Sequence, residues 1–182
     1  MTGVLDWLAL AIVLGWAGFA LGGSVTAPPV ATAVALGMVG LVLLARGWLP
    51  VAGAMALLSP LGVMLPALAL RHLAAGWGVP VLPFGTAELV LFLLAYLVFL
   101  ASAMGVVPAD LYRLGYAPVP VAAMVLAVCA YGFWSGSLFL PLVAVLGQAL
   151  WVMGWGSSNW FDHVLHAVLV PVVIVVLVLR AL

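Results

Sequence analysis

The sequence carries very little charge. Only 4% of its 182 residues are charged, and the four cations and four carboxylates leave the formal net charge at zero. A water-soluble domain has charge on about a quarter of its residues, so eight such side chains cannot cover a soluble surface. There is no lysine and no basic run, so the phosphate contacts of a nucleic-acid-binding protein are missing. We therefore expect neither a soluble domain nor a nucleic-acid partner.

Reactive side chains are equally scarce. The single cysteine, Cys129, cannot form an intrachain disulfide or a paired-cysteine metal site. We expect it to be a small buried hydrophobic residue. A retinal-type Schiff base is excluded by the absence of lysine, and nucleophile elbows, phosphate-binding glycine loops and HExxH are absent. No catalytic residue is predicted from a motif.

Hydrophobic residues dominate instead, at 69% of the chain with a mean hydropathy of +1.47. Such a surface is tolerated only by hydrocarbon, which predicts an integral membrane protein with the lipid bilayer as its first partner. The heavy use of Ala, Leu, Val and Gly, with arginine as the only cation, suggests a GC-rich bacterial genome. We expect a multi-pass protein of the cell membrane, and specifically of the bacterial cytoplasmic (inner) membrane.

Glycine, proline and polar clusters divide the chain into helix-length segments. A membrane-spanning helix needs roughly 20 apolar residues. The pattern predicts an all-α, polytopic transmembrane helix bundle with short loops, forming one domain over residues 1–182. Seven helices are expected, and the alternative is six with one re-entrant segment. The expected segments are 5–21, 30–44, 51–70 with a kink at Pro60 and Pro66, one ending near 104, two within 119–153 divided at 135–137, and 159–179.

Polar residues gather near the expected helix ends. Seven helices place two arginines on each membrane face, so the positive-inside rule gives no orientation. The middle of the membrane is left with only Gln148 and Ser59. Ion transporters and proton pumps usually place ionisable groups near the midplane, so ion transport is disfavoured.

The sharpest polar motif is Asn159 to His166, at the start of the last expected helix. On a continuous helix, Asp162, His163 and His166 share one face. They are the candidate ligands of a divalent metal, with Asp6 or Asp110 as a further oxygen ligand. One histidine as an axial haem ligand is an alternative. The structural alternative is that Asn159 caps the helix, Asp162 favours its dipole, and the histidines bond to loop carbonyls.

Glu88, near the start of the fourth expected helix, is a second polar candidate. An ion pair with Arg71 would satisfy both charges near the interface. The alternative is a role in proton handling or contact with a quinone.

Small residues mark two possible packing seams. Gly15, Gly18 and Gly22 fall on one side of the first expected helix, and Gly132 and Gly136 repeat the GxxxG spacing. Such faces let helices approach closely in lipid. They are candidate contacts either within the chain or with other membrane subunits.

Three functions remain open. The first is a non-catalytic accessory or scaffold subunit of a membrane assembly. The alternative is a small metal-dependent enzyme or cofactor-binding protein at the membrane interface, using Asp162, His163 and His166. The third is a transporter of a neutral or lipidic solute, suggested by the prolines of the third segment and the Gly/Pro-rich loop that follows it.

Overall fold

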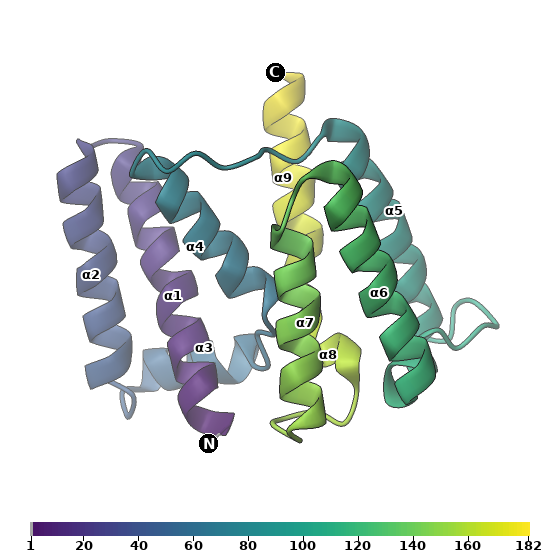
Figure 1. Cartoon of the computed structure of the whole chain (residues 1–182). Helices are drawn as coiled ribbons and strands as arrows, with labels where there is room; N and C mark the ends of the chain where they lie inside the picture. The colour runs from purple at the N-terminus through teal and green to yellow at the C-terminus, as the bar shows by residue number, and fades with distance from the viewer. Residues whose placement is uncertain (1) are drawn as a thin grey trace. The chain divides into compact units, whose positions relative to one another are not determined.

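The computed structural model describes residues 2–182, and its regular secondary structure in that range is entirely helical. The chain divides into two compact units, one extending to Val81 and the other from Leu82 onward. The first unit contains α1 (Thr2–Gly23), α2 (Pro28–Leu44), α3 (Leu49–Leu58) and α4 (Met64–Gly76). Figure 1 shows α1 and α2 lying side by side as a helical hairpin, and α1 also contacts α3 and α4.

The predicted glycine seam of the first helix lies between α1 and α2. A Cβ atom added to Gly15 would stand 2.7 Å from Val39 Cγ2, and one added to Gly22 would stand 3.3 Å from Ala31 Cα. Gly18 has equally little room, with Met38 Cγ 3.0 Å away. The absence of side chains here lets the helices meet almost backbone to backbone. The seam is therefore used inside the first unit.

The third predicted helix is interrupted rather than kinked. α3 ends at Leu58 and α4 begins at Met64, and between them Gly62 adopts a left-handed φ of 59°. Pro60 cannot donate to the helical ladder, and its ring clashes with the carbonyl four residues earlier. α3 also turns by 94° from α2. The prediction of one continuous helix over 51–70 was therefore wrong.

The second unit contains the remaining elements. These are α5 (Thr86–Ala103), the 3₁₀ helix η1 (Tyr112–Tyr116), α6 (Pro118–Ser135), α7 (Phe139–Val152), α8 (Trp160–Val164) and α9 (Leu169–Ala181). Contacts join α5 to α9, α6 to α7, and α7 to α8, while η1 lies against α5, α6 and α8. α6 and α7 form the antiparallel hairpin shown in green in Figure 1.

The turn between α6 and α7 falls where Ser135-Gly136-Ser137 predicted it. Gly136 ends α6 in the left-handed conformation, with φ of 69°, which glycine adopts without steric cost. A Cβ on Gly132 would overlap the ring of Pro141 and approach Ser137 O to 2.7 Å. Gly132 is thus a packing glycine, whereas Gly136 is a helix cap. Of the two glycines of the second predicted seam, only Gly132 lies at a close packing contact.

The last predicted helix is also broken. Leu165 is extended at φ −100° and ψ 155°, and the chain becomes helical again only at Leu169. Pro171, in the first turn of α9, lacks the N–H that would bond to the carbonyl of Ala167 and clashes with it in a continuous helix. One helix over 159–179 was therefore a wrong prediction, and proline explains the break.

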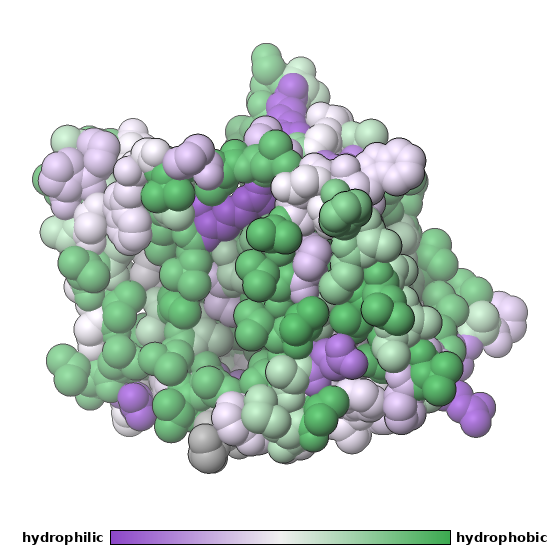
Figure 2. Space-filling view, in the orientation of Figure 1, coloured by the Kyte–Doolittle hydropathy of each residue, from purple (hydrophilic) through white to green (hydrophobic). Residues whose placement is uncertain are grey.

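Fewer helices qualify as membrane spans than the seven predicted. Within the part that the structure describes, three are long and apolar enough, at Gly3–Gly23, Thr86–Ala103 and Pro118–Ser135. The bent pair α2 and α3 raises the number to four if it counts as one span. α7 and α9 are apolar but shorter. In Figure 2, hydrophobic residues in green cover much of the visible flanks of the helices.

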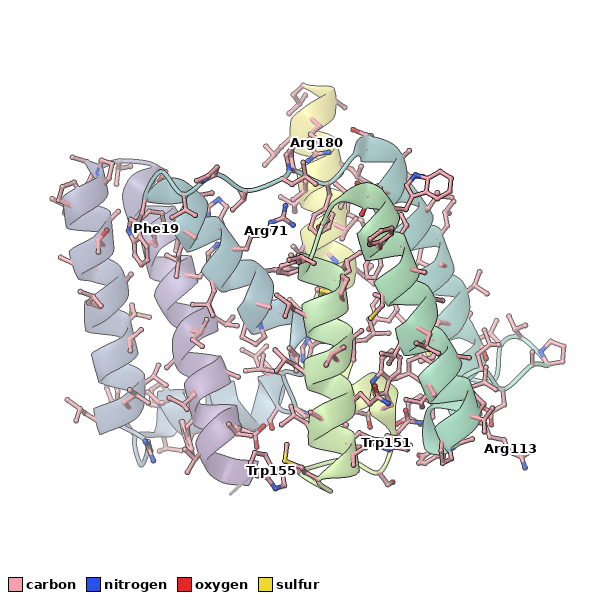
Figure 3. All side chains as sticks on the ribbon, in the orientation of Figure 1. Phe19, Arg71, Arg113, Trp151, Trp155 and Arg180 are labelled. Atoms are coloured by element: carbon pink, nitrogen blue, oxygen red, sulfur yellow. The ribbon has the colours of Figure 1, made fainter. Side chains whose placement is uncertain are left out.

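Charged residues of the second unit lie at opposite ends of its helices. Figure 3 shows Arg113 and Trp151 at one end of this unit and Arg180 at the other. Arg180 Nη1 donates to Phe84 O at 2.9 Å, which ties the end of α9 to the segment before α5. This arrangement agrees with the predicted gathering of charge at helix ends.

Candidate functional site

α8 positions the polar motif of the last predicted helix. Asn159 caps it, since its Oδ1 accepts from Phe161 N at 2.9 Å, and Asp162 falls in the first turn, where the helix dipole favours a carboxylate. Both features match the structural alternative drawn from the sequence. His166 lies beyond the end of α8, in the break before α9. The premise that Asp162, His163 and His166 stack on one helix is therefore wrong.

The three predicted ligands make separate hydrogen bonds. Asp162 Oδ2 accepts from the Tyr112 hydroxyl at 2.8 Å and from the Ser157 hydroxyl at 2.6 Å. His163 Nε2 lies 2.8 Å from Ser157 O, and His166 Nδ1 accepts from Val168 N at 3.1 Å. Among residues 2–182, no three His, Cys, Asp or Glu side chains are grouped to hold a metal ion.

The bond of His163 restricts its chemistry. A carbonyl oxygen only accepts hydrogen bonds, so Nε2 carries the proton and donates it to Ser157 O. Metal coordination through Nε2 would require that this bond break. The ring is only 6% exposed, which leaves little room for such a change.

The predicted additional oxygen ligands lie elsewhere. Asp110 Oδ1 accepts from Arg113 N at 3.1 Å, which caps the start of η1. Asp6 belongs to α1, in the first unit. Asp110 is not brought into a ligand group with Asp162.

Asn159 lies at the centre of the polar residues that the structure does bring together. It is fully buried, and its Nδ2 donates to Tyr112 O at 2.8 Å while its backbone N donates to Ser157 Oγ at 3.0 Å. We call Tyr112, Ser157, Asn159, Asp162 and His163 the Asn159 cluster. It fastens η1, the loop before α8 and α8 to one another through charge-assisted and neutral hydrogen bonds.

Gly115 permits this close approach. A Cβ atom there would overlap Asn159 Oδ1 and stand 2.7 Å from both Asn159 Cγ and Phe161 Cδ2. Any side chain at this position would displace the Asn159 amide. The sequence offered only one sign of this constraint, a glycine among the polar residues between Asp110 and Tyr116.

Aromatic rings connect the Asn159 cluster to the middle of α5. Phe99 lies at the centre, with its ring centroid 4.5 Å from that of Phe161, 6.0 Å from Tyr96 and 6.2 Å from Tyr112. Trp160 extends the series, 5.3 Å from Phe161. Sequence reasoning missed Tyr112 and Ser157 as partners of Asp162, because Tyr112 is 50 residues away and neither residue belongs to a recognised motif.

Trp160 contributes a buried donor. Its indole Nε1 is enclosed and has no hydrogen-bond partner among the described residues. Gly147 of α7 is nearby, since a Cβ there would lie 3.6 Å from this nitrogen and would overlap Val164. An unpaired buried donor costs about 1–3 kcal/mol, so α7 and α8 pack closely here at the expense of one hydrogen bond.

Glu88 has partners within its own unit. Its carboxylate accepts from Gly85 N, forming a cap for α5, and from the Tyr131 hydroxyl of α6. Glu88 therefore joins two helix ends, while its expected ion pair with Arg71 and its role with protons or a quinone stay predictions.

The alkaline stability of the protein should depend on Tyr112. Burial first, and then the hydrogen bond to Asp162, raise the pKa of Tyr112 above its ordinary value of 10.0. The folded state therefore holds this proton more tightly than the unfolded state. The stabilisation is complete below about pH 10 and is lost as pH rises from there toward the folded pKa. We expect the thermal unfolding midpoint in detergent to fall as the pH rises above about 10, and Tyr112→Phe to flatten that fall. An equally steep fall in the variant would contradict the assignment.

Comparisons with protein-family models, with curated proteins and with solved structures give no match to this chain.

Proposed function

We propose that this chain is a non-catalytic integral membrane protein of the bacterial cytoplasmic membrane, acting as an accessory or scaffold subunit that packs against lipid and partner helices. The observation that carries the proposal is how little of its apolar surface the chain covers itself. Only 11% of the residues of α5 are buried within the protein, and only 17% of those of α6. Such faces need lipid or other helices against them.

The Asn159 cluster supports the same proposal. Its hydroxyl, amide and imidazole groups are taken up by hydrogen bonds within the chain. A nucleophile paired with a base, or a convergent ligand set, would be expected of an active centre. The bonds instead favour a structural role that holds the loops at one end of the second unit.

Glycines on α2 suggest where a partner helix would pack. Gly37 and Gly40 have nothing within 4 Å of an added Cβ, unlike Gly15, Gly18 and Gly22 of α1, whose face is covered by α2. Gly37 is also exposed. Small exposed residues allow a second helix to approach closely.

Co-purification in a mild detergent tests this proposal. We expect the tagged full-length chain to elute above its own mass, with one or more membrane proteins enriched over an unrelated tagged membrane protein. Gly37→Leu should weaken that association by about tenfold, while Gly53→Leu, on an equally open helix surface of α3, serves as the matched control. A chain that always elutes alone would contradict the proposal.

A second candidate, a transporter of a neutral or lipidic solute, is favoured by the two interrupted helix pairs. The breaks between α3 and α4 and between α8 and α9 leave non-helical backbone inside apolar segments. Such backbone is tolerated at membrane depth where protein buries it or where it lines a cavity, and broken helices form many transporter sites. Reconstitution into liposomes tests it: glycerol or urea should equilibrate faster than in protein-free vesicles, and equal rates would count against it.

The metal-dependent alternative at Asp162, His163 and His166 requires these side chains to exchange their present hydrogen bonds for a ligand. Elemental analysis of the purified protein tests it directly. A stoichiometric metal that is lost in His163→Ala and His166→Ala would favour this alternative over the scaffold.

A further inference from the structure

α3 lies crosswise to the helices of the first unit. It turns by 94° from α2, and Figure 1 shows it at the end of the α1–α2 hairpin where α1 begins. A helix of its 10 residues is about 15 Å long. If α1 and α2 cross a membrane with the usual tilt of about 20°, α3 runs along the membrane plane and advances through the bilayer by only about 5 Å.

Three side chains indicate the depth of this end of the hairpin. The guanidinium carbon of Arg46, in the connection between α2 and α3, lies 5.8 Å from the ring centroid of Trp7 in α1. Trp48 directly precedes α3 and is 57% exposed. Tryptophan rings and arginine side chains near helix ends favour the headgroup region, which accommodates both their apolar and their polar parts. α3 therefore begins at the membrane interface.

The exposed half of α3 is entirely apolar. At 3.6 residues per turn, one half of the helix holds the exposed residues Leu49, Pro50, Ala52, Gly53, Ala56 and Leu57. The opposite half packs on the first unit, since Val51 is only 6% exposed and α3 contacts α1. A helix at a wet interface turns a polar or charged face to water, but α3 carries no polar side chain at all. Its outer half therefore suits hydrocarbon rather than water.

We propose that α3 is an in-plane membrane helix whose exposed half binds the acyl chains of a single leaflet, just below the headgroups. Leu49 and Leu57, which are 85% and 83% exposed, bury their side chains among these acyl chains. Because α3 does not cross the bilayer, it displaces lipid from that leaflet alone. The proposal rests on the membrane location within the proposed function, but it requires neither a partner protein nor a transported solute.

Spin labels on the full-length protein in lipid vesicles test this placement. Single cysteines at Leu49, Gly53 and Leu57, in a Cys129→Ser background, carry the label along the exposed half of α3. Collisions with oxygen, which concentrates in hydrocarbon, should exceed those with a water-soluble nickel complex severalfold at all three positions. Their depths should agree within about 4 Å, whereas a re-entrant helix would change depth by about 12 Å between Leu49 and Leu57. Ala56→Cys, on the same half, replaces any of the three that fails to fold.

Labels on α2 supply the matched control. Leu36 and Leu44 are 65% and 90% exposed, and a crossing α2 should place Leu36 deeper by about 11 Å. If Leu36 lies in hydrocarbon, the in-plane proposal alone is overturned by nickel access to α3, by a steady change of depth along it, or by labels that neither reagent reaches. The last result would mean that another protein chain covers this half. Nickel access to Leu36 as well would overturn the membrane location itself.

Discussion

Replacing Asn159 by alanine should destabilise the protein by about 2–4 kcal/mol. The side chain is fully buried and makes two hydrogen bonds, one to Tyr112 O and one from Phe161 N. Alanine removes both bonds and leaves a buried carbonyl and a buried N–H without a partner. The free energy of unfolding in detergent, or the shift of the thermal midpoint, measures the effect.

Asn159→Ser separates the two contributions. Serine is an effective N-cap and retains an acceptor for Phe161 N, but it is too short to reach Tyr112 O. We expect about half of the cost of Asn159→Ala. If both variants unfold like the wild type, Asn159 does not hold η1 to α8, and the structural role of the Asn159 cluster is refuted.

The helix boundaries were predictable where a local breaker marks them. Pro28 and Pro29 begin α2, and Gly136 ends α6, so the segments 30–44 and 119–135 correspond closely to helices. Glycine and proline act through backbone geometry of their own and of the preceding turn. At these boundaries, the residue that predicts the end of a helix from the sequence is also the residue whose backbone geometry ends it in the structure.

The two interrupted helices show where hydrophobicity alone misleads. Apolar composition predicted one span through Pro60, with only a kink there, and one through Pro171. Lipid exposure depends on side chains, whereas helix continuity depends on backbone hydrogen bonds, which proline interrupts. Pro171 lies where the last predicted helix is interrupted, as Pro60 lies where the third is interrupted. The two breaks account for part of the drop in candidate spans, while α7 is simply shorter than a span.

The candidate site was only partly predictable. Asn159 as a cap and Asp162 in the first turn of a helix follow from adjacent residues, and both are confirmed. The bond from Tyr112 to Asp162 joins residues 50 positions apart. It depends on how η1 folds back onto α8, which no local pattern contains. The metal prediction relied on helical stacking of His166, and the break after Val164 removed that geometry.

Gly115→Ala should be as damaging as the loss of Asn159, for a different reason. The new Cβ would overlap Asn159 Oδ1 and crowd Phe161, both of which are buried. Displacing the amide breaks the same hydrogen bonds and adds steric strain, so we expect about 2–4 kcal/mol of destabilisation. Gly37→Ala is the matched control, since an added Cβ there meets nothing within 4 Å and alanine favours an exposed helix by up to about 1 kcal/mol.

The double variant tests whether the two residues act through one contact. With Asn159 already replaced by alanine, the oxygen that the new Cβ would strike is gone, and only the crowding against Phe161 remains. Gly115→Ala should then cost at least about 1 kcal/mol less than it does in the wild type. Additive costs would mean that Gly115→Ala acts through crowding against Phe161 alone, and that η1 does not rest on the Asn159 side chain.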